Sequence, residues 1–128
     1  MPLVQIHLRK GKSPAHIRAI SDGVHRALVE AFKVPADDKF HLVRQYEPDE
    51  LIYDPHYLGV ERSNDVVFIH IFAGNWRDTA AKKALYARIA ELLAEKPGLR
   101  PDDVQIVLTL SGRDDWSFGM GRASYVTE

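Results

Sequence analysis

The stretch Met1-Pro2-Leu3-Val4-Gln5-Ile6-His7-Leu8 stands at the beginning of the chain. Its apolar residues at positions 4, 6 and 8 recur every second residue, a period that predicts a half-buried β-strand. No leader segment is visible in front of it, so we expect the strand to begin at the chain terminus. The rest of the fold is interpreted around this first strand.

Pro2 is the residue of this stretch that bears most on function. A small residue after the initiator usually allows Met1 to be removed, which would leave Pro2 with a free secondary amine. Such an amine, held at the end of a rigid strand, can do acid–base or nucleophilic chemistry. If Met1 is retained, the Pro2 nitrogen is an amide and can do neither. The structural alternative is an ordinary proline on an edge strand, where the missing N–H costs nothing.

Composition limits the function classes. The chain has 128 residues, 45% of them hydrophobic and 27% charged, with a net charge of −1, which is typical of one globular domain. Near-neutral charge gives no electrostatic indication of a nucleic acid or an anionic membrane as partner. The absence of cysteine excludes disulfides, thiolate catalysis and cysteine-based zinc sites. Because no signal peptide or membrane-length apolar run is visible, we expect a cytoplasmic protein.

Further along the chain, two helices and three more strands are predicted. Ser13-Pro14 begins an amphipathic helix that extends to about residue 32, and a strand follows over 40–46. Residues 47–64 are rich in turn formers. The nearly continuous apolar run 66–72 predicts a strand covered on both faces. Asp78 caps a second helix that ends near residue 96, and residues 104–110 form a last strand. The glycine-containing tail carries the aromatic residues Trp116, Phe118 and Tyr125.

The two halves of the chain resemble each other, which predicts the fold. The Ile-His dipeptide at 6–7 recurs 63 positions later at 69–70, and each half places a proline and aspartates before its second strand. We therefore predict one α+β domain, residues 1–128, built from tandem β-α-β halves of about 1–64 and 65–128. A four-stranded mixed sheet would carry both helices on one face, and a neighbouring subunit would cover the other face. A ferredoxin-like βαββαβ module is the competing architecture.

The segments Val34-Pro35-Ala36-Asp37-Asp38 and Asp115-Trp116-Ser117-Phe118-Gly119, together with Pro2 and the two β-α-β halves, resemble the tautomerase superfamily over the whole chain. The resemblance is strongest to its long members, the malonate semialdehyde decarboxylase group. It implies a homotrimer that works without metal or organic cofactor and whose catalytic group is the N-terminal proline.

The same resemblance assigns roles to individual residues. Pro2 would be the catalytic amine, Asp38 the carboxylate beside it and Arg77 the second of two family arginines, while Asn75 stands where the first arginine is expected. The substitution at position 75 puts efficient decarboxylation in doubt. The histidine of the cis-3-chloroacrylic acid dehalogenases is replaced by Val29, so dehalogenation is disfavoured. Substrate-binding positions would be Asn75 and the aromatic wall of Trp116, Phe118 and Tyr125.

Opposing effects on the Pro2 amine decide its role. Burial under aromatic side chains and the charge of Arg77 would lower the pKa of the amine, whereas Asp38 would raise it. With one arginine rather than two, we predict that Pro2 is a neutral general base. Arg77 would bind the carboxylate of a small substrate. Structural alternatives are a solvated surface arginine for Arg77, a turn residue for Asp38 (with Asp37 able to take its place), and subunit-interface packing for the aromatic residues.

The predicted activity is keto–enol tautomerisation of small 2-oxo acids that carry a carboxylate. Decarboxylation or hydration of a three-carbon acid is the enzymatic alternative, and a non-catalytic trimeric binding module or a dimeric ferredoxin-like sensor is the alternative outside catalysis. His7 and His70 lie within strands and are interpreted as packing or hydrogen-bonding residues. No His, Asp and Glu cluster with metal-ligand spacing is present, so no metal site is predicted.

Overall fold

The computed structural model describes residues 1–126. Its main elements follow the order β1 (Leu3–Arg9), α1 (Pro14–Phe32), β2 (His41–Tyr46), β3 (Val67–Gly74), α2 (Thr79–Glu95) and β4 (Val104–Ser111). Short 3₁₀ turns lie between β2 and β3, before β4 and after it. The predicted helices and strands are all present, with boundaries that differ from those predicted by two residues at most.

Both helices begin at the caps that the sequence indicates. The Ser13 hydroxyl accepts a hydrogen bond from the backbone N–H of His16 at 3.1 Å, and the Asp78 carboxylate accepts one from Ala81 at 2.9 Å. Lys33 ends α1 in the left-handed conformation, where its N–H bonds the carbonyl of Leu28. Among residues 1–126, no helix is long and apolar enough to cross a membrane.

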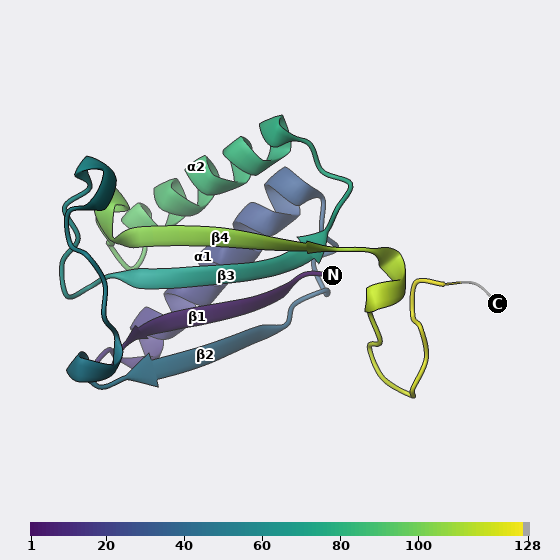
Figure 1. Cartoon of the computed structure of the whole chain (residues 1–128), viewed down its shortest axis with the longest axis horizontal. Coiled ribbons are helices and arrows are strands. Elements are labelled where there is room, and N and C mark those ends of the chain that lie inside the picture. Colours follow the sequence, from purple (N-terminus) through teal and green to yellow (C-terminus); the bar gives the residue numbers. More distant parts are fainter. Residues whose placement is uncertain (127–128) are drawn as a thin grey trace.

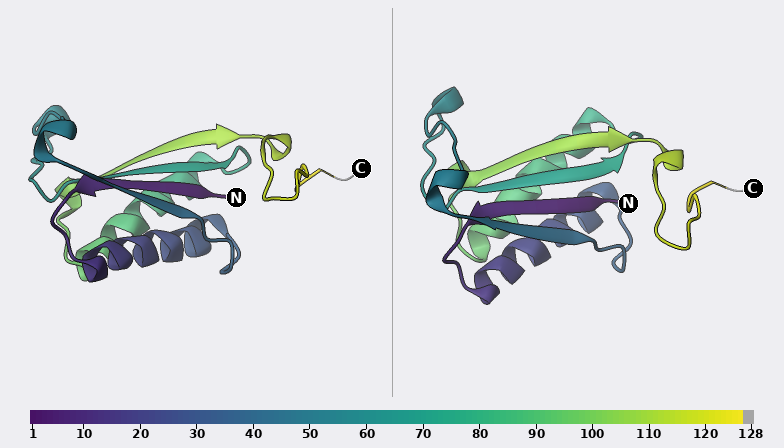
Figure 2. Two further views of the ribbon diagram at one scale, coloured as in Figure 1. Left: turned by 90° about the horizontal axis from the view of Figure 1, so that it is seen from below. Right: turned by 60° about the horizontal axis from the view of Figure 1, so that its bottom comes forward.

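The sheet has the order β2-β1-β3-β4 and is mixed. β1 runs parallel to β2 and β3 runs parallel to β4, while β1 and β3 pair antiparallel at the centre. Each half is therefore a β-α-β unit whose two strands are neighbours. This pairing excludes the ferredoxin-like alternative, in which the β-α-β strands are split by a third strand. Both helices lie on the same face of the sheet, as Figure 1 and Figure 2 show.

The hydrophobic core lies between that sheet face and the two helices. Every second residue of β1 is buried, and the side chains of Val4, Ile6 and Leu8 are at most 2% exposed. The same alternation holds for β3, whose buried residues are matched by buried residues of α1 and α2. The helical members of this core are Ile20, Val24, Leu28, Leu85, Ile89 and Leu93.

The opposite face of the sheet is open. Phe68, His70 and Phe72 of β3 are only half-buried on it, so the prediction that this strand is covered on both faces is not met within one chain. The reason is that both helices pack on the other face. On the open face His7 Nδ1 lies 2.6 Å from the Tyr46 hydroxyl, and His70 Nε2 lies 2.7 Å from the Thr109 hydroxyl. Both histidines thus make the sheet-face hydrogen bonds predicted for them.

In each half, a carboxylate that precedes the second strand bonds to the chain segment that precedes the first strand of the same half or its loop. Asp103 is 1% exposed and accepts hydrogen bonds from the Ser63 N–H at 2.6 Å and the Ser63 hydroxyl at 2.7 Å. Asp38 has the corresponding place before β2, but its partner is the terminal amine of Met1, at 2.7 Å. Asp103 therefore fixes a loop residue in the second half, whereas Asp38 binds the terminal amine in the first half.

We predict that Asp103→Asn destabilises the fold. The amide has one acceptor instead of two, so a buried group near Ser63 loses its partner, at a cost of about 1–3 kcal/mol in the free energy of unfolding. Urea denaturation measures the change. Asp49→Asn is the control, since that carboxylate is exposed and its loss should cost less than about 1 kcal/mol. Equal losses in the two variants would contradict this assignment.

His41 should make stability depend on pH. Burial, the nearby Lys39 and His25 lower the pKa of His41 to about 4 from 6.5, against the opposing charge of Asp22. Between these values the unfolded chain binds more protons than the folded one, so stability falls as pH decreases from 6.5 towards 4. Calorimetry should show a smaller fall in Tm from pH 7 to pH 5 for His41→Gln than for the native chain, whereas exposed His56→Gln should match the native chain.

Candidate active site

The sheet topology brings four chain segments together around the N-terminus. Because β1 and β3 are antiparallel, Leu3 pairs with Phe72, and the terminus lies beside the loop that leads from β3 to α2. Because β1 and β2 are parallel, the Val4 N–H bonds the Phe40 carbonyl at 2.9 Å, which places the segment before β2 next to the terminus. β4 ends at the same end of the sheet, and the C-terminal tail begins there (Figure 1).

The terminal amine is buried in an ion pair. Met1 and Pro2 are both buried, and the Met1 amine lies 2.7 Å from Asp38 Oδ2. The amine also bonds the hydroxyl of Tyr125. The other carboxylate oxygen of Asp38, Oδ1, is buried and has no hydrogen-bond partner within the described chain. A buried acceptor without a partner is uncommon, so this oxygen is available to a bound molecule.

Arg77 presents unused donors to the same place. Its Nη2 donates to the Phe32 carbonyl at 3.1 Å, but Nε and Nη1 are buried without a partner among residues 1–126. Its Cζ lies 4.7 Å from the centroid of the Phe32 ring and 4.5 Å from that of Trp76. Burial lowers the pKa of Arg77, while Tyr125 and Asp38 oppose the shift. The guanidinium stays charged, and its two donors without a partner suit a carboxylate.

These groups line a cavity of about 290 Å³. Its cationic groups outnumber its carboxylates, so it favours an anion. Burial raises the pKa of Tyr125, with Asp38 acting in the same direction and Arg113 and Arg77 against it, so the hydroxyl remains protonated at neutral pH. The lining residues are Met1, Phe32, Lys33, Pro35, Asp38, Trp76, Arg77, Arg113 and Tyr125.

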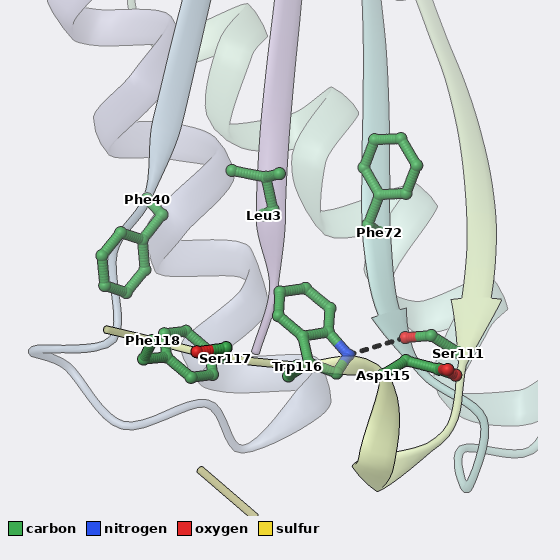
Figure 3. Close-up of a pocket in the computed structure, with 8 residues that line it drawn as sticks. All are labelled: Leu3, Phe40, Phe72, Ser111, Asp115, Trp116, Ser117 and Phe118. Carbon is green, nitrogen blue, oxygen red and sulfur yellow. Dashed lines mark hydrogen bonds between the residues drawn. The ribbon is translucent and has the colours of Figure 1, made fainter. Parts of the chain in front are cut away.

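An apolar hollow of about 510 Å³ lies at the end of β1 on the open face of the sheet (Figure 3). Trp116 stacks on Phe118 with ring centroids 5.5 Å apart, and its indole N–H donates to the Ser111 hydroxyl at 2.8 Å. Phe118 meets Tyr125 edge to face at 5.4 Å, which joins the aromatic wall to the amine cluster. Leu3, Phe40 and Phe72 complete the apolar part of the hollow.

The structure brings together most of the residues singled out from the sequence. Asp38 and Tyr125 touch the terminal amine that precedes Pro2, and Arg77 lines the same cavity, whereas Asp37 is exposed. Trp116 and Phe118 line the neighbouring hollow. Asn75 is exposed and lies outside the set of residues that line either space, so its predicted contact with a substrate has no support here.

Sequence reasoning assigned no site role to several lining residues, among them Trp76 and Arg113. Trp76 lies between the two positions that the resemblance assigns, and its ring rests on Gly74, where an added Cβ would come within 2.0 Å of the indole. The resemblance assigns roles to its neighbours Asn75 and Arg77 but none to Trp76. Arg113 stands 37 positions after Trp76, and no local pattern connects the two residues. Only the fold shows that both belong to the cavity.

Comparison with known proteins identifies curated relatives and similar solved structures that cover nearly the whole chain. Two curated proteins of Bacillus subtilis (strain 168) match nearly the whole chain: the probable tautomerase YusQ, 44% identical over 98% of this chain and 99% of its own length, and the probable tautomerase YrdN, 28% identical over 99% and 98%. Crystal structures of malonate semialdehyde decarboxylase superpose with a TM-score of 0.91 at 35% identity, covering 96% of this chain and 95% of that one.

A second structure, FG41 malonate semialdehyde decarboxylase inhibited by 3-bromopropiolate, superposes with a TM-score of 0.90 at 40% identity and covers 96% of this chain and 93% of that one. A fused 4-OT symmetric trimer, at 20% identity and a TM-score of 0.78, shares the fold. Two family models described as tautomerase enzyme match residues 38–119 and residues 2–61. Together with the terminal amine cluster described above, these matches show that the chain belongs to the tautomerase family of enzymes.

Proposed function

We propose that this enzyme is a cofactor-independent keto–enol tautomerase of small 2-oxo acids, with the Pro2 amine as general base after removal of Met1. The observation that carries the proposal is the terminal amine, buried against Asp38 beside a guanidinium with unused donors. A buried ammonium–carboxylate pair is costly to assemble, and a free N-terminus rarely occupies such a place without a function.

Removal of Met1 would open the site. The Met1 side chain is 4% exposed and lines the cavity, so it fills space that a substrate needs. Its loss moves the amine by one residue, about 3.8 Å along the chain, to the Pro2 ring. Asp38 Oδ2 and the Tyr125 hydroxyl, which hold the Met1 amine, then lose that partner, and the carboxylate can hold the new amine.

The proposed reaction is a proton transfer from oxygen to carbon. Arg77 binds the substrate carboxylate through donors that have no partner in the described chain and places the enol beside Pro2. The neutral amine accepts the enol O–H proton as the C=O bond forms, and the resulting ammonium returns a proton to the adjacent carbon. Tyr125, whose hydroxyl is protonated at neutral pH, donates a hydrogen bond to the substrate oxygen. Trp116 and Phe118 exclude water from one side of this space.

Decarboxylation or hydration of malonate semialdehyde is the second candidate. It is favoured by 35% and 40% identity to the two malonate semialdehyde decarboxylases, the first of which is described with both activities. It is disfavoured by Asn75, which replaces an expected arginine and is exposed. A direct assay with malonate semialdehyde separates the two candidates.

We also propose a homotrimer, by analogy with the related fused 4-OT trimer. The open sheet face, with the half-buried Phe68 and Phe72, is the surface that subunit contacts would cover. Light scattering that gives a monomer or a dimer would contradict the trimer. A trimer without turnover of any enol would instead support the non-catalytic binding module.

Pro2→Ala tests the base directly. We expect kcat/KM for ketonisation of phenylenolpyruvate to fall by about 10²–10⁴, because the ring amine that the strand positions is replaced by a more mobile primary amine. An intact-mass measurement of each preparation establishes whether Met1 is present. Equal rates for the native enzyme and the variant, both lacking Met1, would rule out Pro2 as the base. Native protein that retains Met1 should be inactive.

Arg77 variants test the carboxylate site. Arg77→Gln should raise KM and lower kcat/KM by about 10–100-fold, since a charge-assisted bidentate bond contributes about 1.5–3 kcal/mol. Arg77→Lys keeps the charge without the planar fork and should fall between the native enzyme and Arg77→Gln. An unchanged KM in both variants would show that the substrate carboxylate binds elsewhere.

A further inference from the structure

We propose that His25 of α1 is a positioning residue, whose imidazole holds the Ala36 carbonyl and thereby fixes Asp38 against the amine at the chain terminus. His25 neither lines the cavity nor bonds the amine, so its effect on the proposed reaction passes through Asp38. This role rests on the proposed function in taking the Pro2 amine as the base. It adds a residue of the helix layer that the cavity lining does not reveal.

Asp38 ends a short exposed segment that few contacts hold in place. Val34 is 3% exposed and anchors the segment in the core, but residues 35–37 are all exposed. The Asp38 N–H donates to the Pro35 carbonyl at 3.0 Å, which closes a turn without fastening it to the rest of the fold. Within residues 1–126, His25 is the one side chain from another element that bonds the backbone of this turn.

Three side chains on one face of α1 bond the chain that turns back beside the helix and enters β2 (Figure 2). The bonded pairs are His25 with Ala36 at 2.8 Å, Asp22 with Lys39 at 2.8 Å and Ser21 with His41 at 2.7 Å. Positions fall along the helix as they rise along the segment, so the segment runs antiparallel to α1. Asp38 lies between the first pair and the second.

The two pairs after Asp38 are supported by other contacts, whereas the pair before it is not. The Val4 N–H bonds the Phe40 carbonyl at 2.9 Å, and β2 begins its pairing with β1 at the next residue. The side chains of the Lys39–Asp22 ion pair are 36% and 62% exposed, so this pair contributes little. Loss of the His25 bond would therefore release the side of the Asp38 turn that nothing else fastens.

The hydrogen bonding of His25 indicates that the imidazole is present for this bond rather than for packing. A carbonyl oxygen only accepts, so Nε2 carries the proton and Nδ1 is the bare acceptor of the neutral ring. Nδ1 is buried without a partner in the described chain, and the ring of His41 lies edge-on beside it with centroids 6.1 Å apart. A buried unpaired acceptor is unfavourable, and an apolar side chain would avoid it. The Nε2–H bond to Ala36 is the gain that offsets this loss.

Displacement of Asp38 would change the protonation of the base. A carboxylate beside an amine favours the ammonium form, and the effect weakens as the two groups separate. If the turn relaxes, Asp38 spends less time beside the amine, and the pKa of the Pro2 amine falls. The neutral base then persists to lower pH, so the acidic limb of the kcat/KM profile moves to lower pH.

Substitutions at position 25 separate this role from packing. His25→Leu removes the N–H donor and keeps a similar volume, and His25→Asn keeps an amide that reaches only the place of Nδ1. His25→Gln carries its amide N–H to about the place of Nε2. Ser21→Ala is the matched control, because it removes a bond from the same helix face beyond Asp38. Each protein is shown by intact mass to lack Met1, and NMR titration of isotope-labelled proline gives the pKa of the Pro2 amine.

We expect His25→Leu and His25→Asn to lower the pKa of the Pro2 amine by about 0.5–1 unit, the range that one hydrogen bond can shift. The midpoint of the acidic limb of kcat/KM for enol ketonisation should move by the same amount. His25→Gln should restore most of the parent value, and Ser21→Ala should leave it unchanged. In an Asp38→Asn background, His25→Leu should cause no further change.

The positioning role is overturned if the pKa of the Pro2 amine is the same in His25→Leu and His25→Asn as in the parent. An equal shift in His25→Gln would show that the N–H donor has no part. An equal shift in Ser21→Ala would indicate general loosening of α1, and a shift that persists in Asp38→Asn would show that Asp38 does not transmit it. Each of these results rejects the proposal.

Failure of the tautomerase proposal would give a different result, because the titration needs no turnover. A His25-dependent pKa of the Pro2 amine in a protein that ketonises no enol would support the positioning of Asp38 and reject the proposed reaction. Conversely, rapid ketonisation with an unchanged pKa in His25→Leu would reject only the role of His25.

Discussion

The ion pair between the terminal amine and Asp38 is the interaction around which the site is arranged. It is possible only because parallel pairing of β1 with β2 sets the start of one strand beside the segment that leads into the other. A charged terminus at the end of a buried strand must be neutralised or reach water. Asp38 neutralises it, and the buried Arg77 edge nearby makes the same place attractive to an anion.

The two β-α-β halves place a carboxylate at equivalent positions, Asp38 and Asp103, but these carboxylates have different partners. Asp103, at the corresponding place in the second half, accepts hydrogen bonds from Ser63 and fastens a loop to the sheet. In the first half the chain begins where that loop would continue, so Asp38 faces a free amine in place of a peptide N–H. Equivalent carboxylates thus bond a loop serine in one half and the terminal amine in the other.

Each charged group of the cavity comes from a different element, which limits how they can move relative to one another. Asp38 precedes β2, Arg77 follows β3, and Arg113 follows β4, so the sheet spaces them. Trp76 lies against both guanidiniums, and the stacked Trp116 and Phe118 continue this wall onto the open sheet face (Figure 3). A rigid arrangement of this kind lowers the reorganisation needed when charge develops on a substrate oxygen.

The sequence by itself determined the local structure and half of the site. Ser13 and Asp78 mark helix starts because capping is a contact within one turn, and the alternation of Val4, Ile6 and Leu8 marks a strand because burial repeats with the backbone period. Pro2, Asp38 and Arg77 could be singled out, since a family pattern placed them. Strand order, the exposure of Asn75 and the contact of both Arg77 and Arg113 with Trp76 were decided only by the tertiary structure. These features depend on which distant strands pair and in what register, and no local sequence signal encodes that choice.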